Sequence, residues 1–186
     1  MSLIPAFEIG VWNAWIFVFP YVLVTFGLPY LAVSKESMLF HLPPHSKKEK
    51  KLFGFLLVTY GALCLYGIFL PLKLSTALFY VGFIVYLLGM IFIIMTMLNF
   101  ATASSDKPLT KGVFRISRNP MYVGFSLTFI GIGLSCASWI VLLLAVITII
   151  LNNVLIIPEE RLLLEKYGDS YREYMNRTPR WIGIPK

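Results

Sequence analysis

The chain has 186 residues, of which 58% are hydrophobic and 13% are charged, and its formal net charge is +7. A soluble domain is about half apolar and about a quarter charged, so this composition, with a mean hydropathy of +0.79, excludes an ordinary soluble domain. We therefore expect a single domain that is a polytopic membrane bundle. The positive charge is better explained by basic loops on the inner side of a membrane than by binding of nucleic acid.

The first apolar segment covers residues 11–33. About 20 apolar residues in a helix cross the hydrocarbon core of a bilayer, so this segment is long enough to be the first membrane span. Pro20, Gly27 and Pro29 interrupt it, and we expect neighbouring helices to absorb the kinks that they cause.

Residues 34–51 form a polar, basic segment that carries five lysines and two adjacent prolines. This composition predicts a solvated loop on the positive-inside side, with binding to anionic lipid headgroups as an alternative. His41 and His45 lie in this segment without Cys or carboxylate partners at ligand spacing, so we expect no metal site. Cys64 and Cys136 are too few for a disulfide framework and are predicted to be buried free thiols.

Residues 52–72 and 74–98 read as a helical hairpin with its turn around Lys73. Small residues allow helix backbones to approach closely inside a membrane. We therefore expect close helix contacts at the glycines of this hairpin, which are Gly54, Gly61, Gly67, Gly82 and Gly89.

A second hairpin is predicted after the polar segment 99–120. Residues 121–157 contain no charged residue, which is enough for two short spans, about 121–134 and 139–157, joined by a tight turn at 135–138. Amide side chains are unusual in lipid, so those near its end are expected to face protein or the site. They are Asn152 and Asn153.

The C-terminal tail is predicted to be an amphipathic element on the membrane surface. Pro158 suits the start of a helix, with Glu159 and Glu160 in its first turn, where the helix dipole favours acids. Gly168 is expected to end this first piece, and the spacing Ser170-x-x-Glu173 predicts a capping box for a second helix. The tyrosines that recur at helical spacing in the tail are Tyr167, Tyr171 and Tyr174.

The distribution of basic residues predicts the orientation. Segments 34–51, 99–120 and 158–186 carry five, four and six Lys or Arg residues, which is 15 of the 16 in the chain, and the remaining one is Lys73. Because basic residues favour the cytoplasmic side, five transmembrane helices place the N-terminus outside and the amphipathic tail inside. We therefore expect an all-α, multi-pass integral membrane protein whose active site is cytoplasmic.

Residues 111–124 are a short basic loop that leads into an apolar helix. Asn119 suits the N-cap position, because its side-chain oxygen can accept from a free N–H group of the first turn, and Pro120 suits the first helical position. Arg115 and Arg118 then lie beside the positive end of the helix dipole. Free N–H groups, a positive dipole end and nearby guanidinium groups predict an anion site.

The two glutamates of the tail return to the same side and a similar depth as this basic loop. A basic helix N-terminus opposite a pair of carboxylates suits a zwitterionic ligand, since one end holds an anion and the other an ammonium group. The alternative is that Arg115 and Arg118 are ordinary flanking arginines and that Glu159 and Glu160 only begin a helix.

A family resemblance favours the first interpretation. Arg-Asn-Pro-x-Tyr-x-Gly at 118–124, an apolar hairpin and then a Glu-Glu pair resemble the isoprenylcysteine carboxyl methyltransferase family, especially its compact prokaryotic and archaeal members. The wider group includes integral-membrane phospholipid N-methyltransferases. The resemblance extends over about residues 109–179 and departs at Asn119, where the family often has His. The matching residues are Arg118, Pro120, Tyr122, Gly124, Glu159 and Glu160.

This resemblance implies a methyltransferase whose cofactor, S-adenosylmethionine, binds within residues 109–180 and leaves as S-adenosylhomocysteine. It implies that Arg118, Glu159 and Glu160 are catalytic. The residues implied in cofactor binding are Arg118, Asn119, Pro120, Tyr122, Gly124, Glu159 and Glu160. The favoured reaction is carboxyl methylation of a lipophilic acceptor, such as a prenylcysteine-like molecule that enters from the bilayer, because a carboxylate is already ionised and needs no general base.

Three alternatives stay open at this point. N-methylation of a phospholipid amine would need a glutamate to accept a proton. The C-terminal region is distantly similar to the membrane sterol-reductase group, which would use NADPH, although this chain is short for that fold. A non-enzymatic membrane subunit or channel would bind neither cofactor.

Overall fold

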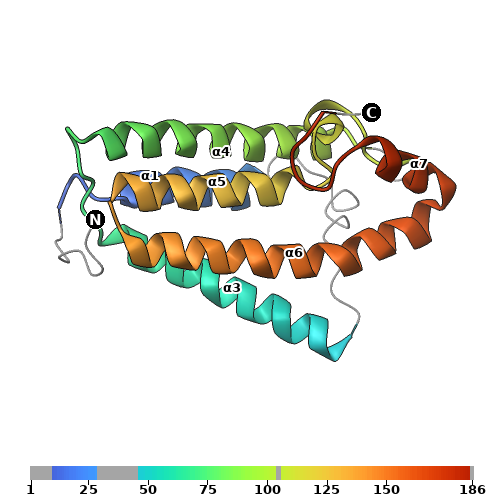
Figure 1. Cartoon of the computed structure of the whole chain (residues 1–186), viewed down its shortest axis with the longest axis horizontal. Helices are drawn as coiled ribbons and strands as arrows, with labels where there is room; N and C mark the ends of the chain where they lie inside the picture. The colour runs from blue at the N-terminus through green and yellow to red at the C-terminus, as the bar shows by residue number, and fades with distance from the viewer. Residues whose placement is uncertain (1–9, 29–45, 104–105, 185–186) are drawn as a thin grey trace.

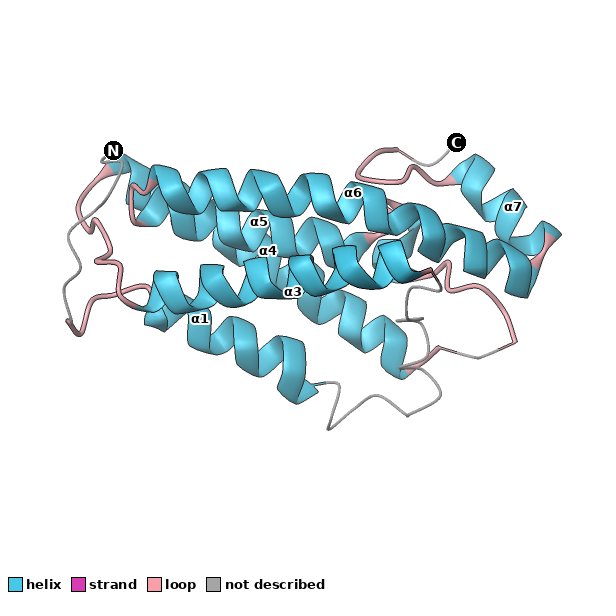
Figure 2. Ribbon diagram, turned by 90° about the horizontal axis from the view of Figure 1, so that it is seen from below, coloured by secondary structure: helices cyan, strands magenta, loops and turns pink. Residues whose placement is uncertain are grey.

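The computed structural model describes residues 10–28, 46–103 and 106–184 (Figure 1). Every regular element in these residues is a helix, and no strand is present there (Figure 2), so the predicted all-α class is confirmed for the described chain. The elements are α1 (Trp15–Val22), the π-helical turn η1 (Leu23–Gly27), α3 (Lys47–Ile68), α4 (Ala77–Ala101), the 3-10 turn η3 (Gly112–Arg115), α5 (Pro120–Ser135), α6 (Trp139–Tyr167) and α7 (Asp169–Arg177). Outside the described residues lie the end of the first predicted span, 29–33, and the part of the first loop that holds the two histidines.

Three of these helices, α3, α4 and α6, are long and apolar enough to cross a membrane, and two shorter helices, Trp15–Gly27 and Pro120–Ser135, are also apolar. Large apolar side chains cover the outward face of α4, where Ile84 is 58% exposed and Leu98 is 53% exposed. Soluble monomers rarely expose such a continuous apolar surface. The fold therefore fits an integral membrane protein.

Helices α4 and α5 form the most intimate contact of the bundle, and glycine explains it. The two helices run antiparallel side by side (Figure 1). A Cβ atom added at Gly82 would lie 2.5 Å from the backbone nitrogen of Ser135, and one added at Gly131 would lie 2.7 Å from the carbonyl oxygen of Gly82. The predicted close contacts at Gly82 and Gly89 are thus confirmed, and Gly124 supplies the facing surface for Gly89.

The same prediction is wrong for two glycines of α3. Neither Gly54 nor Gly61 has any atom of another element within 4 Å of an added Cβ, whereas a Cβ at Gly67 would lie 3.3 Å from the side chain of Val18. The sequence showed glycines on both helices of the predicted hairpin, but α3 packs mainly against α6 and α4 against α5. Tertiary packing therefore decides which glycines face a neighbour.

One end of the bundle collects the positive charge. Helices α3 and α5 begin there, α4 and α6 end there, and α7 lies beside them (Figure 1). Among the described residues, the lysine at position 73 is the one basic residue at the opposite end, in the turn before α4. We call the end of the bundle that collects the positive charge the basic end.

Helix α3 begins earlier than the sequence predicted. The lysine-rich residues 47–51 form its first turns rather than the end of a loop. A capping box starts the helix, because the Ser46 Oγ accepts from the Glu49 backbone N–H at 3.1 Å and the Glu49 Oε2 accepts from the Ser46 N–H at 2.8 Å. The Ser-x-x-Glu signal was present in the sequence, and the basic composition concealed it.

Helix α6 also differs from the prediction, because it continues through Pro158 instead of restarting there. A proline inside a helix costs about 3 kcal/mol, and here the buried packing of α6 outweighs this cost. Glu159 and Glu160 therefore lie inside a helix, where the expected stabilisation by a helix N-terminus does not apply. Gly168, with a φ of +57°, ends α6 as predicted.

The predicted capping box of the tail is wrong. Helix α7 begins at Asp169, and the Ser170 hydroxyl donates to the Tyr167 carbonyl oxygen at 2.7 Å instead of capping the helix. Tyr171 and Tyr174 are buried, so α7 packs against the basic end through its aromatic face.

Candidate functional site

At the start of α5 the predicted positions of Asn119 and Pro120 are correct, but the predicted hydrogen bond is absent. Pro120 occupies the first turn and Asn119 is the N-cap residue, yet the Asn119 side chain accepts no capping hydrogen bond. Its Nδ2 instead donates to Glu160 Oε1 at 3.3 Å and to the Arg180 carbonyl oxygen at 3.2 Å. The amide therefore links α5 to α6 and to the C-terminal segment.

Glu160 is the centre of a buried charge cluster. It is 4% exposed, and its Oε1 pairs with Arg118 Nη2 at 3.2 Å. Its Oε2 accepts from Arg180 Nη2 at 2.7 Å and from Arg180 Nε at 3.2 Å. We call Arg118, Asn119, Glu160 and Arg180 the Glu160 cluster. Two guanidinium groups share one carboxylate, so the cluster has one excess positive charge.

Arg118 is the most buried cation of this cluster and is not fully satisfied. Its Nη1 donates to the Met175 carbonyl oxygen at 3.3 Å, and its backbone N–H donates to the Pro179 carbonyl oxygen at 3.0 Å. Its Nε is buried without a hydrogen-bond partner among the described residues. An orphaned charged donor inside protein is unfavourable, and it indicates a place for an additional acceptor.

Glu159, the neighbour of Glu160, has a different environment. Its Oε1 accepts from the Tyr122 hydroxyl at 2.5 Å, and no cation pairs with it among the described residues. The two glutamates thus separate: Glu160 is neutralised by arginines, and Glu159 is a half-buried carboxylate with a neutral partner. A carboxylate of this kind can hold a cation or accept a proton.

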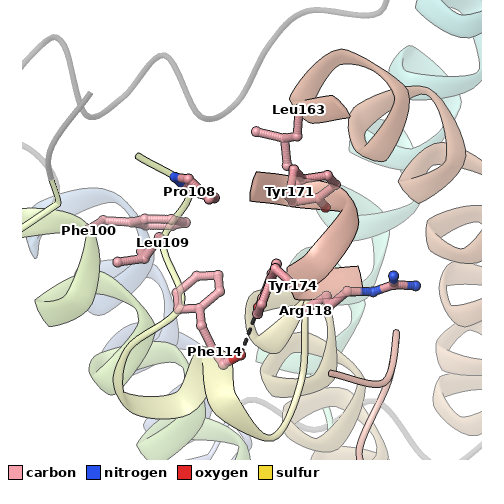
Figure 3. Close-up of a pocket in the computed structure, with 8 residues that line it drawn as sticks. All are labelled: Phe100, Pro108, Leu109, Phe114, Arg118, Leu163, Tyr171 and Tyr174. Atoms are coloured by element: carbon pink, nitrogen blue, oxygen red, sulfur yellow. Dashed lines mark hydrogen bonds between the residues drawn. The ribbon is translucent and has the colours of Figure 1, made fainter. Parts of the chain in front are cut away.

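A small apolar pocket of about 30 Å³ lies next to the cluster (Figure 3). The Arg118 stem forms part of its wall while the guanidinium group points away from it. The Tyr174 hydroxyl donates to the Phe114 carbonyl oxygen at 2.7 Å, and burial raises the pKa of Tyr174 and Tyr171, so both stay neutral. The other lining residues are Phe100, Pro108, Leu109 and Leu163.

Two of the predicted residues lie elsewhere. Arg115 is exposed at the end of η3 and forms none of the contacts of the Glu160 cluster. Gly124 faces α4, where an added Cβ would lie 2.6 Å from the Ile93 side chain, so helix packing accounts for it. Pro120 starts α5. The other five predicted residues meet directly, as the pairs Asn119–Glu160, Arg118–Glu160 and Tyr122–Glu159.

Sequence reasoning missed the C-terminal segment 179–183. Besides the Arg180 side chain, this segment supplies backbone contacts, because the Ser117 hydroxyl donates to the Arg180 carbonyl oxygen at 3.4 Å and the Gly183 N–H donates to the Ile116 carbonyl oxygen at 3.1 Å. Only the basic character of the tail hinted at it. Its place over the start of α5 depends on tertiary structure.

A comparison with protein families gives one finding. The model of the phospholipid methyltransferase family matches residues 52–170, which is more than half of the chain and includes most of α3, all of α4 to α6 and the start of α7. No curated protein matches the chain. The matched region contains Arg118, Asn119, Tyr122 and both glutamates, while Arg180 lies beyond it.

Proposed function

Because the chain belongs to the phospholipid methyltransferase family, we propose that it is an integral-membrane methyltransferase that uses S-adenosylmethionine and acts on a lipophilic acceptor. The observation that carries the proposal is the Glu160 cluster with its excess positive charge, placed beside a carboxylate that lacks a cation. The family match favours this function over the sterol-reductase and non-enzymatic alternatives.

The residues present fit the cofactor in three respects. The orphaned Nε of Arg118 and the excess charge of the cluster suit a carboxylate group. Glu159 suits an ammonium or sulfonium group, since it has no cationic partner among the described residues. The aromatic wall formed by Phe114 and Tyr174 suits a purine ring, although a pocket of about 30 Å³ is too small to hold a base as it stands.

When bound, the cofactor supplies an electrophilic methyl group. The work of the chain is to position the acceptor and to exclude water. Arg118 and Asn119 would hold and orient the anionic part of the ligand at the start of α5, with Pro120 fixing the loop. Glu160 keeps both arginines in place, and Tyr122 fixes the Glu159 carboxylate through its hydroxyl.

Two acceptor groups fit this site, each on one observation. A carboxylate, as in a prenylcysteine-like molecule, needs no general base, and position 119 holds an amide instead of an imidazole. A phospholipid amine is favoured by Glu159, which can accept a proton because no arginine neutralises it.

The two reactions differ in pH dependence and product stability. Methylation of a carboxylate with a pKa of about 3.5 should proceed at a nearly constant rate from about pH 6 to 8. Methylation of an amine should accelerate over the same range, because the amine must first lose a proton. With labelled cofactor, base-labile product identifies a methyl ester and base-stable label in a phospholipid identifies N-methylation.

The proposed topology has five membrane spans, with the N-terminus outside and the basic end in the cytoplasm. Its support is the collection of positive charge at one end of the bundle. Cysteines introduced at Ser37, Ser75 and Ser105 test it by accessibility labelling of intact cells. Only Ser75→Cys should be labelled from outside, and labelling of Ser75→Cys and Ser105→Cys from one side contradicts the topology.

Calorimetry of the purified protein tests the cofactor. S-adenosylhomocysteine should bind with a measurable heat, whereas NADPH should give none. Binding of NADPH alone would favour a reductase, and the absence of binding by both would favour a non-enzymatic protein.

A further inference from the structure

A second polar site lies deeper in the bundle, away from the Glu160 cluster. Asn152 of α6 is fully buried, and its Nδ2 donates to the Tyr60 hydroxyl of α3 at 2.8 Å. Its Oδ1 is also buried and has no hydrogen-bond partner among the described residues. Both residues lie within helices that are apolar enough to span a membrane.

In the orientation shown, the amide is half satisfied, because its Nδ2 has a partner and its Oδ1 has none among the described residues. Rotation of the amide would let Oδ1 accept from the Tyr60 hydroxyl and would turn the Nδ2 donor toward the position that Oδ1 now occupies. An unpaired polar atom in an apolar environment is costly, and polar residues inside a membrane are usually functional. The adjacent Asn153 differs, since it is exposed and its Oδ1 accepts from Trp181 Nε1 at 3.3 Å.

The polar pair lies on the same side of the helices as the proposed methyl-transfer site. Asn152 precedes Glu159 by seven residues, which is about two helical turns on one face of α6 and about 10 Å along its axis. The Tyr60 ring packs against Phe125 and Phe129 of α5 with ring centroids 5.5 Å apart in each case. These two phenylalanines follow the site residue at position 122 on the inner turns of α5.

We propose that Asn152 and Tyr60 form a hydrogen-bonding site for an acyl ester carbonyl of the acceptor lipid, about two helical turns from the group that is methylated. This inference rests on the proposed function. With Oδ1 accepting from the Tyr60 hydroxyl, the free Nδ2 of Asn152 donates to the carbonyl oxygen. An ester-linked lipid has a carbonyl group at this depth below its headgroup, whereas an isoprenoid chain has only hydrocarbon there. The pair therefore selects acceptors by their linkage and not by their headgroup.

Two lipids that differ only in this carbonyl group test the proposal. Binding of dimyristoyl phosphatidylethanolamine and of its dialkyl ether counterpart to the full-length protein in detergent is measured by titration with native mass spectrometry. The wild-type protein should bind the diester about three- to tenfold more tightly, as one hydrogen bond inside a membrane allows. Asn152→Leu should remove this preference, and the matched control Asn153→Leu should keep it.

Equal affinity of the wild-type protein for the two lipids overturns the proposal. This comparison uses only the wild-type protein, so it does not depend on the folding of a variant. A diester preference that survives Asn152→Leu also overturns it, since the amide would then only join α3 to α6. Calorimetry with S-adenosylhomocysteine on the same preparations distinguishes failure of this inference from failure of the proposed function. Cofactor binding without a lipid preference defeats this inference alone, and a lipid preference without cofactor binding defeats the methyltransferase function and, with it, the role of the lipid as acceptor.

Discussion

Helices α4 and α5 are joined by backbone contact, whereas α3 and α6 are joined by side chains. In the first pair, glycines on both helices bring the backbones together along much of their length. In the second, α3 is inclined to α6 (Figure 1), and the contacts include the Tyr60–Asn152 hydrogen bond and an ion pair between Arg161 and Glu49 at 3.0 Å. The first pair is thus a closely packed scaffold that fixes the start of α5, and the second leaves the buried Oδ1 of Asn152 without a partner among the described residues.

The largest loss of stability is expected from a substitution where the backbones of α4 and α5 are closest, at Gly82. Gly82→Leu places side-chain atoms where a Cβ alone would lie 2.5 Å from the Ser135 backbone. We expect the free energy of unfolding to fall by more than about 4 kcal/mol, with loss of the folded protein in detergent.

Gly61→Leu is the matched control, because nothing lies within 4 Å of a Cβ at Gly61. Its thermal midpoint in detergent should match that of the wild-type protein. Equal tolerance of both substitutions would show that the α4–α5 contact is not rigid.

Glu160→Gln should have the next largest effect. The amide cannot neutralise Arg118 and Arg180, and removal of one partner from a buried charge cluster costs about 3–5 kcal/mol. We expect a clear fall in the thermal midpoint as well as weaker binding of S-adenosylhomocysteine. Glu165→Gln, at an exposed position on the same helix, should leave both unchanged. A normal midpoint for Glu160→Gln would mean that the cluster contributes to ligand binding alone.

The sequence predicted α5 and its turn well because their signals are local. Pro120 starts the helix, and Ser138 caps the next one by accepting from the Val141 N–H at 3.4 Å. Pro158 misled the prediction because its local preference for a helix start lost to the packing of a long apolar helix. Local signals also placed Asn119 correctly at the N-cap position, but they predicted that its side chain would accept from the first turn of α5. In the structure the amide donates to the buried carboxylate of Glu160 instead.

The composition of the site was predicted in part for a related reason. Arg118, Tyr122 and the two glutamates come together because antiparallel helices return to one end of the bundle, which the distribution of basic residues already indicated. Arg180 could not be found in this way, because its contact with Glu160 depends on how the segment after α7 folds back. The different environments of Glu159 and Glu160 likewise depend on partners that are distant in the sequence, since Tyr122 contacts the first and two arginines contact the second.

Glu159→Gln should change binding more than folding. The glutamine oxygen can still accept from the Tyr122 hydroxyl, which now donates to Glu159 at 2.5 Å, so the thermal midpoint should stay close to that of the wild-type protein. The loss of a charged partner should weaken binding of a cationic ligand about tenfold or more. Calorimetry with S-adenosylmethionine, whose sulfonium is cationic, measures this effect. Unchanged affinity would remove Glu159 from the proposed site.

The smallest effect is expected at the ion pair between α3 and α6. The side chains of Arg161 and Glu49 are 52% and 20% exposed, so water and salt screen their attraction. A double-mutant cycle with Arg161→Gln and Glu49→Gln, measured by unfolding in detergent, should give only a small coupling free energy that decreases with added salt. Glu49 also caps α3 through Ser46, and the cycle separates that local contribution from the ion pair. A large coupling that salt does not change would show that α3 and α6 are held together as firmly as α4 and α5. A small coupling leaves the Tyr60–Asn152 hydrogen bond as the buried polar contact between the two helices, and this is the pair that the proposed lipid carbonyl would join.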